Sequence, residues 1–178
     1  MEYGTARFRA LLLEYDRKSP TVLTEAAVKF RARPGYFDGL ADLAGDDADA
    51  VSSGATWLIK HELENGRRPT PEWVRSLAAA LDRVGPWDAK LHICQSIRFI
   101  SVPDDCRPSF HAWLLPLLDH SRPFLRAWAL DALCRLTGVD GVLGATATAA
   151  LDRLTEDPAA SVRARVRALK KEFPRSIG

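Results

Sequence analysis

Residues 114–119 read Leu-Leu-Pro-Leu-Leu-Asp, and apolar residues follow at positions 125, 129, 132 and 133. Weaker copies of this pattern return along the chain at a nearly constant interval. Each copy can be aligned on the apolar residue that opens the second of two expected helices, which gives Val51, Trp87, Leu125 and Val162. These positions are 36, 38 and 37 residues apart. Such an interval is typical of proteins built from repeated helical units.

The spacing within each copy predicts a pair of helices. Apolar or small residues recur four and seven positions after each anchor, and these offsets lie on one face of an α-helix. They are Ala55, Leu91, Ala129 and Val166 at the fourth position, and Leu58, Cys94, Ala132 and Leu169 at the seventh. Paired leucines upstream, such as Leu115 and Leu118, mark the first helix. Each copy is therefore expected to form a helical hairpin whose apolar faces are buried by neighbouring copies.

Prolines mark several expected helix starts. Ser19-Pro20, Thr70-Pro71 and Asp157-Pro158 each place a capping residue before a proline, whose missing N–H costs nothing in the first turn of a helix. Pro116 differs, because the apolar pattern continues beyond it through residues 117 and 118. We therefore expect Pro116 to kink a helix rather than to end it.

In these features the chain resembles the HEAT-repeat family over roughly residues 34–173, most closely at 113–135. The residues that carry the resemblance are Leu115, Pro116, Leu118, Leu125, Arg126, Ala129, Ala132, Leu133, Leu151, Leu154, Asp157, Val162 and Arg163. The first two copies depart from the pattern, since Ser52 and Asp88 stand where the later copies have arginine. The resemblance implies an all-α fold, a right-handed α-solenoid of about five helical hairpins. It also implies a scaffold or adaptor role and no catalytic chemistry.

The whole chain, residues 1–178, is expected to form a single HEAT-repeat-like domain. An N-terminal capping hairpin is predicted at residues 1–33, and repeats at 34–66, 70–104, 107–138 and 139–173. A cap is needed because a terminal copy has one side in contact with water. Its two helices are expected around Phe8 and Leu12, and from Thr21 to about Arg31.

Composition argues against several classes of protein. The net charge of +2 is too weak to indicate a nucleic-acid partner. No apolar run approaches the length of a membrane span, and the start of the chain carries charge early, unlike a secretory signal. The three cysteines are odd in number and lack a paired spacing, which favours reduced thiols. We therefore expect a cytoplasmic protein without a membrane partner.

The sequence also lacks the common patterns of catalytic and metal-binding sites. Its glycines do not form a nucleotide-binding motif, and no serine stands in a Gly-x-Ser-x-Gly turn. The pair His61-Glu62 lacks the second histidine that a zinc-binding helix requires one turn later. We therefore expect no enzymatic activity, no metal and no cofactor.

The second helices predict a surface for binding a partner. If the apolar stripe points to the core, positions five, six and nine residues after each anchor point away from it, onto the concave face that solenoids use for binding. The candidate residues there are Trp57, Lys60, His92, Ile93, Leu130, Asp131 and Arg167. An apolar centre with a charged rim is typical of a protein interface. The alternative is that the Trp57 ring folds back onto its own hairpin, and that Ile93 and Leu130 pack against neighbouring copies.

Two functions remain open on this basis. The first is a non-catalytic protein–protein interaction scaffold or adaptor, including a small inhibitor or immunity-type protein that binds a toxin, and its main support is fold analogy. The second is a DNA-repair enzyme, because some bacterial alkylpurine DNA glycosylases are built of HEAT-like repeats. Trp57 and Asp131 would then surround a cationic base while Arg167 contacts phosphate. Their separation by two copies, roughly 20 Å, favours the first function, with another protein as the partner and nucleic acid not expected.

Overall fold

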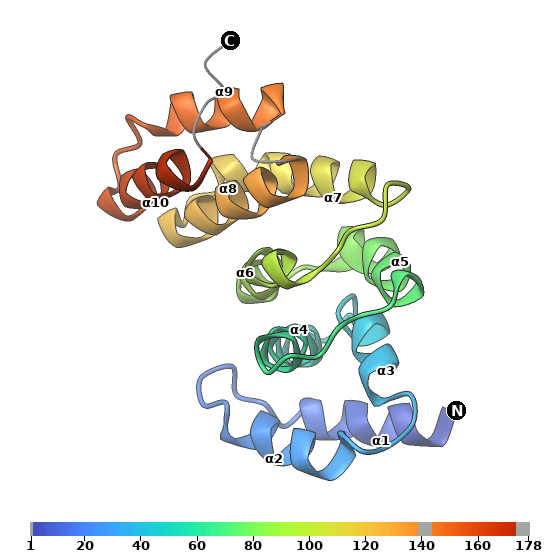
Figure 1. Cartoon of the computed structure of the whole chain (residues 1–178). Coiled ribbons are helices and arrows are strands. Elements are labelled where there is room, and N and C mark those ends of the chain that lie inside the picture. Colours follow the sequence, from blue (N-terminus) through green and yellow to red (C-terminus); the bar gives the residue numbers. More distant parts are fainter. Residues whose placement is uncertain (1, 139–143, 174–178) are drawn as a thin grey trace. The chain divides into compact units, whose positions relative to one another are not determined.

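The computed structural model describes residues 2–138 and 144–173, and every regular element in these ranges is a helix (Figure 1). The α-helices are α1 (Glu2–Leu12), α2 (Thr21–Phe30), α3 (Tyr36–Leu43), α4 (Asp49–Glu64), α5 (Pro71–Ala80), α6 (Trp87–Ser96), α7 (Arg107–Leu114), α8 (Pro123–Thr137), α9 (Ala145–Leu154) and α10 (Ala160–Glu172). Three 3₁₀ helices are η1 (Leu81–Arg83), η2 (Ile97–Phe99) and η3 (Leu115–Asp119). The prediction of an all-α fold is confirmed.

The helices fall into two compact units, Met1–Cys106 and Arg107–Gly178. Unit 1 contains α1 to α6, and unit 2 contains α7 to α10. Taken two by two in chain order, the first eight α-helices lie inside the predicted hairpin ranges. Contacts join α1 to α2, α3 to α4, α7 to α8 and α9 to α10. The predicted start of the last repeat, at residue 139, lies outside the described residues, while α9 and α10 lie within its range. The single domain over residues 1–178 stays a prediction.

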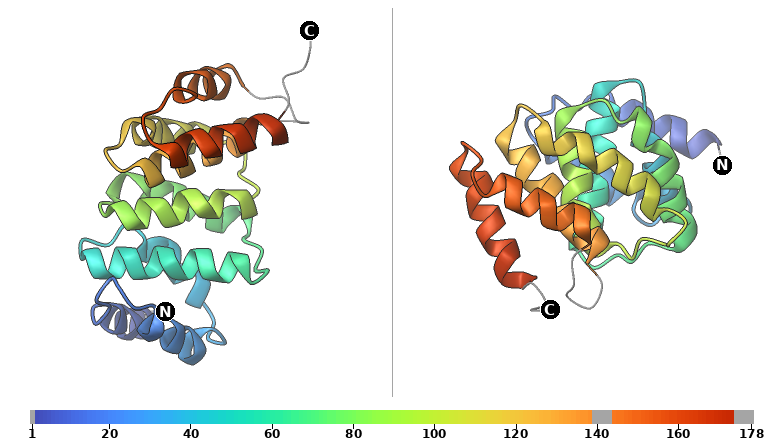
Figure 2. Two further views of the ribbon diagram at one scale, coloured as in Figure 1. Left: turned by 90° about the vertical axis from the view of Figure 1, so that its left-hand side faces the viewer. Right: turned by 90° about the horizontal axis from the view of Figure 1, so that it is seen from above.

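The apolar stripe of the second helices forms the core, as predicted. In unit 1, α4 and α6 lie side by side (Figure 2), and Val51, Ala55, Leu58, Leu91 and Cys94 are buried while Trp87 is half-buried. In unit 2, α8 and α10 pack together, and Leu125, Ala129, Ala132, Val162, Val166 and Leu169 are buried. The period of 3.6 residues therefore placed these side chains correctly.

Pro116 corrects one local prediction. Helix α7 ends at Leu114, and the chain continues as the 3₁₀ helix η3, in whose first turn Pro116 stands. In a continuing α-helix the proline ring would meet the carbonyl four residues earlier, so the tighter 3₁₀ turn replaces the expected kink. Leu117 and Leu118 are nevertheless buried, as the apolar pattern indicates.

Two aspartates close the turns that precede second helices. In unit 1, Asp46 accepts hydrogen bonds from Arg9 through Nε at 2.6 Å and Nη2 at 2.8 Å, and from the backbone N–H of Ala48. In unit 2, Asp157 accepts from Arg126 through Nε at 2.9 Å and Nη2 at 2.8 Å, and from the N–H of residue 159. Each carboxylate therefore orders its own turn and ties it to another helix pair, by the bidentate geometry that arginine favours.

Asp157 makes the stability of unit 2 sensitive to acid. Its hydrogen bonds from Arg126 hold the pKa of Asp157 below its usual range. A carboxyl group with a lowered folded pKa contributes stability that is present above its unfolded pKa, about 3.9, and is lost as the pH falls through the folded pKa. At pH 7, Asp157→Asn should lower the free energy of unfolding by roughly 1.5–3 kcal/mol, and this difference should shrink in acid. Urea denaturation of the variant and of the unsubstituted chain, at pH 7 and again in acid below the unfolded pKa of about 3.9, measures this difference.

The matched control is Asp119→Asn in the same unit. Asp119 also pairs with an arginine, Arg153, but its side chain is 68% exposed. An exposed pair of this kind contributes roughly 0–1 kcal/mol. Equal effects of the two substitutions would contradict the role assigned to Asp157.

Candidate anion-binding site

The structure places the four predicted site residues of unit 1 on the adjacent helices α4 and α6, but not on one exposed surface. Trp57 is half-buried and stacks on His61, with ring centroids 5.0 Å apart and planes 12° apart. Lys60 pairs with Glu64 one turn later at 3.0 Å. Ile93 is fully buried. Ile93 therefore belongs to the hydrophobic core, whereas the sequence predicted that it lies on an exposed apolar surface for a partner.

His92 is a half-buried residue that faces α4. Its Nδ1 lies 3.2 Å from the hydroxyl of Thr56, which is buried. Burial lowers the pKa of His92 to about 4, and the nearby Asp88 opposes this shift without cancelling it. The imidazole is therefore neutral at pH 7 and serves the packing of α4 against α6 rather than a charged interface rim.

The predicted residues of unit 2 are also mostly internal. Leu130 is fully buried, Asp131 is 1% exposed, and Arg167 on α10 is exposed. Asp131 accepts hydrogen bonds from Arg135 Nε at 2.7 Å and from Arg165 Nη1 at 3.2 Å. Its carboxylate thus joins α8 to α10.

The predicted exposure of Ile93, Leu130 and Asp131 is therefore wrong. The helical wheel assumed that each second helix contacts other helices through a single apolar stripe. In the structure the second helices also pack on each other, α4 on α6 and α8 on α10. Helix α4 has further contacts with α1, α2 and α3, and α8 with α7, η3 and α9. Wider burial of this kind carries no separate periodic signal in the sequence.

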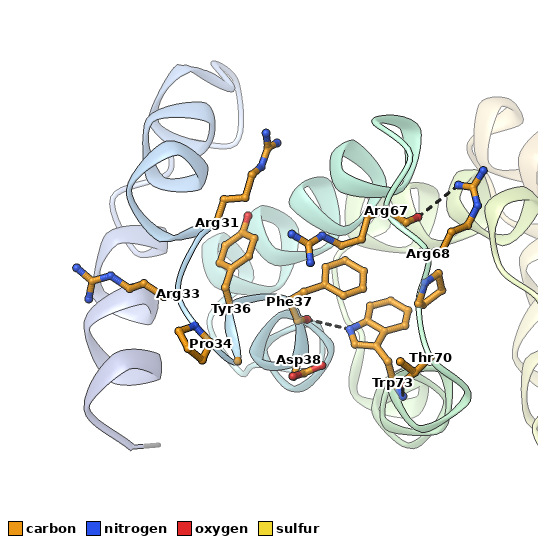
Figure 3. A pocket seen from close by; sticks show the side chains of 12 residues that line it. Arg31, Arg33, Pro34, Tyr36, Phe37, Asp38, Arg67, Arg68, Thr70 and Trp73 are labelled. Carbon is orange, nitrogen blue, oxygen red and sulfur yellow. Dashed lines mark hydrogen bonds between the residues drawn. The ribbon is translucent and has the colours of Figure 1, made fainter.

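A different part of unit 1 gathers charge around a cavity. The segment between α2 and α3 and the segment between α4 and α5 line a pocket of about 280 Å³ (Figure 3). The arginines that line it are Arg31, Arg33, Arg67 and Arg68. The wall also contains one carboxylate, that of Asp38. Its aromatic part comes from Tyr36, Phe37 and Trp73. We refer to this cavity as the arginine pocket.

A glycine places Arg67 at the pocket. Gly66 adopts a φ of +91°, a left-handed conformation that glycine reaches without strain. The N–H of Gly66 bonds to the carbonyl of Leu63, and the N–H of Arg67 to the carbonyl of Glu62 at 3.0 Å. This pair of bonds is a Schellman motif, which ends α4 and turns the chain back over its last turn. Arg67 is thereby brought beside the side chain of Glu62.

Glu62 holds two of the pocket arginines from behind the wall. Its side chain is 4% exposed, and its Oε1 accepts from Arg31 Nε at 2.9 Å while its Oε2 accepts from Arg67 Nε at 3.2 Å. The hydroxyl of Tyr36 lies 3.5 Å from Oε1. Burial raises the pKa of Tyr36, so the phenol stays a neutral donor to the carboxylate. Both arginines use Nε for Glu62, so their Nη groups take no part in these two hydrogen bonds.

Aromatic rings support the arginines. Phe37 and Trp73 are stacked at 4.5 Å, and the indole Nε1 donates to the carbonyl of Phe37 at 2.8 Å. The guanidinium of Arg67 lies 4.9 Å from the Phe37 ring centroid, and that of Arg33 lies 4.7 Å from the Phe30 centroid. These are cation–π distances. Because Phe37 and Trp73 are only 8% and 3% exposed, the rings position the cations and present no open face for a planar ligand.

The pocket is a local excess of positive charge. Its four arginines outnumber the two carboxylates of Asp38 and Glu62 by two. Residues 1–106 as a whole hold 14 basic and 16 acidic side chains. Arginines are thus locally concentrated in the lining of the pocket, which favours a compact anion over an extended polyanion.

Comparison with family models, curated proteins and solved structures finds no match to this chain. Within the described ranges, no His, Cys, Asp or Glu side chains gather in the groups of three that could hold a metal ion. In the same ranges, no helix has the length and apolar character needed to cross a bilayer. The arginine pocket is therefore the feature of the described structure from which we argue function.

The sequence held one signal for this pocket that the repeat analysis did not use. Arg31 and Arg67 are 36 residues apart, as are Phe37 and Trp73, and this equals the first interval of the repeat. Equivalent positions of neighbouring helix pairs come close together in space when the pairs stack. Glu62 shows no such spacing to either arginine in the sequence, and only the fold places it where it accepts from both of them.

Proposed function

We propose that this chain is a non-catalytic protein-binding module, a small HEAT-like solenoid of helix pairs that recognises an anionic group of a partner protein in the arginine pocket. The observation that carries the proposal is the pair Arg31 and Arg67, fixed by one buried carboxylate beside a cavity of about 280 Å³. A cytoplasmic location belongs to the same proposal.

Preorganisation is the physical basis of binding. Arginine loses side-chain freedom when it binds a ligand, which costs roughly 0.5–1.5 kcal/mol for each side chain. Here Glu62 already holds Arg31 and Arg67 in the folded protein, and Phe37 supports the second of them. An incoming oxyanion therefore meets donors that are already oriented, and charge-assisted hydrogen bonds to such donors are the stronger kind.

The charge distribution favours a protein partner over DNA. Duplex binding depends on neutralising many phosphates along an extended basic surface. Residues 1–106 carry a slight acidic excess outside the pocket, so a duplex would be repelled around any single contact. In unit 2, Asp131 is enclosed by Arg135 and Arg165, which argues against its use as a carboxylate for a flipped base. A protein that presents one acidic group fits these observations better.

Substitution of the two held arginines tests the function. The double variant Arg31→Gln and Arg67→Gln removes the paired guanidinium groups and should reduce capture of the partner from a native-cell lysate at least about tenfold, the effect of roughly 1.4 kcal/mol. Quantitative mass spectrometry of proteins captured by the full chain measures the loss. The variant leaves the buried Glu62 without these two partners, so circular dichroism and urea denaturation must first show that it keeps the helical content and the fold of the unsubstituted chain.

The matched control is Arg75→Gln with Arg83→Gln, which makes the same charge change on exposed arginines of the same unit. Arg75 pairs with Asp105 at 2.7 Å, outside the pocket. The control should capture the partner as the unsubstituted protein does. If the pocket variant captures the same proteins in the same amounts, the pocket is not the recognition site.

A further inference from the structure

Resting on the proposed function, we infer that the arginine pocket binds a phosphate monoester dianion, as carried by a phosphorylated side chain of a partner protein. Carboxylates and nucleotides also present negatively charged oxygen atoms, so each of them is a possible ligand for arginines. Three properties of the pocket select the phosphate monoester among them: its charge, its arrangement of donors and its size.

The charge of the pocket matches a dianion. Its arginines exceed the carboxylates of Asp38 and Glu62 by two positive charges. A phosphate monoester carries about −1.5 to −2 at pH 7, whereas a glutamate or aspartate of a partner carries one negative charge. The guanidinium groups of Arg33 and Arg68 point away from those of Arg31 and Arg67 (Figure 3), so this excess charge is spread around the pocket. A phosphate monoester offsets more of it than a carboxylate does.

The donors are arranged for more than two acceptor atoms. Arg31 comes from the end of α2 and Arg67 from the turn after α4, so two of the arginines that line the cavity come from two separate segments. One guanidinium satisfies both oxygens of a carboxylate in the bidentate manner. A phosphate monoester has three terminal oxygens and accepts from both groups at once.

The size of the pocket and its aromatic wall favour a protein source over a nucleotide. Pockets for drug-sized ligands and cofactors span roughly 300–1,000 Å³, so a pocket of about 280 Å³ lies just below this range and has room for a phosphate together with part of the side chain that carries it. Recognition of a base requires an open ring face for stacking. Phe37 and Trp73 face each other and are nearly buried, so the base of a nucleotide would find no such surface.

Calorimetric titration of the full chain tests the inference with three small probes. Phenyl phosphate is the monoester, benzoate is the carboxylate with the same ring, and adenosine monophosphate is the nucleotide. We expect phenyl phosphate to bind at least about tenfold more tightly than benzoate, and adenosine monophosphate to bind no more tightly than phenyl phosphate. Affinity for phenyl phosphate should fall below a pH of about 6, where the monoester takes up a proton.

Lysine substitutions separate geometry from charge. Arg31→Lys and Arg67→Lys keep the positive charge and remove the planar fork, so each should weaken phenyl phosphate binding about tenfold or more. Arg75→Lys, which changes an arginine outside the pocket, should leave it unchanged. Equal binding by the pocket variants and the control would overturn the inference, because the guanidinium pairs would then have no part in it.

Glu62→Gln tests the positioning role of the buried carboxylate. Removing its negative charge makes the pocket more positive, which by electrostatics alone should strengthen anion binding. If Glu62 instead orients Arg31 and Arg67, the variant should bind phenyl phosphate more weakly. Tighter binding would overturn the positioning role. The lysine variants, which retain Glu62, keep the inference testable should Glu62→Gln fail to fold.

The outcomes also separate this inference from the proposed function. Equal affinity for benzoate and phenyl phosphate would overturn phosphate selectivity while leaving an anion-binding pocket for a partner. Binding of adenosine monophosphate ten times more tightly than phenyl phosphate would overturn the protein source. If none of the probes binds, the phosphate inference falls. If Arg31→Gln with Arg67→Gln also captures the same proteins in the same amounts, the proposed function falls with it.

Discussion

Asp131→Lys should destabilise unit 2 by at least about 3–5 kcal/mol, the cost of leaving buried charges without their partner. Asp131 is 1% exposed, and its two oxygens accept from Arg135 and Arg165. The substitution replaces the carboxylate by a third cation between two guanidinium groups. Arg165 also lies 4.1 Å from the Trp128 ring centroid, so its displacement would disturb that contact as well.

Urea denaturation followed by circular dichroism measures this effect, with Asp119→Lys as the control. Asp119 lies in the same unit and is 68% exposed, so its reversal should change the free energy of unfolding by less than about 1 kcal/mol. An Asp131→Lys protein as stable as this control would mean that residue 131 faces water, as the helical wheel first predicted.

Leu133→Ala should cost roughly 2–5 kcal/mol of the free energy of unfolding, the range for truncating a buried leucine. Leu133 is fully buried in α8. The lost isopropyl group leaves a cavity that the surrounding helices fill only in part, which adds to the lost transfer free energy. The cost depends on how far α8 can relax, and its packing against α7, η3, α9 and α10 limits that relaxation.

Phe124→Ala provides the comparison on the same helix. Phe124 is 51% exposed, in the first turn of α8, although its ring makes an edge contact with Trp128 at 6.4 Å. Its removal should cost less than about 1.5 kcal/mol, the upper range for an aromatic pair. A Leu133→Ala protein that unfolds at the same urea concentration as the unsubstituted chain would mean that the register of α8 is shifted.

The repeat analysis succeeded where burial follows a single period. Val51, Leu125 and Val162 are each buried because an amphipathic helix turns its apolar stripe toward the helices it packs against. The same reasoning failed for Ile93 and Leu130, which are fully buried although they lie off that stripe, on helices that pack against α4 and α10. No sequence pattern distinguishes these two positions from exposed ones.

The arginine pocket was beyond reach of the sequence for a different reason. Arg31 and Arg67 lie at helix ends and in connecting segments, where no hydrophobic period applies. Their 36-residue spacing is consistent with proximity in space, but it does not indicate that both arginines donate hydrogen bonds to Glu62. A buried glutamate on a helix reads in the sequence as an ordinary solvated charge.

Because Arg31 and Arg67 both donate to Glu62, these three residues should be retained or replaced together during evolution. A related sequence that lost the glutamate would keep two neighbouring arginines without the carboxylate that they share. A related sequence that lost both arginines would leave a buried carboxylate without these ion-pair partners. Lineages of this chain should therefore carry residues 31, 62 and 67 as a set, or have exchanged all three for apolar residues.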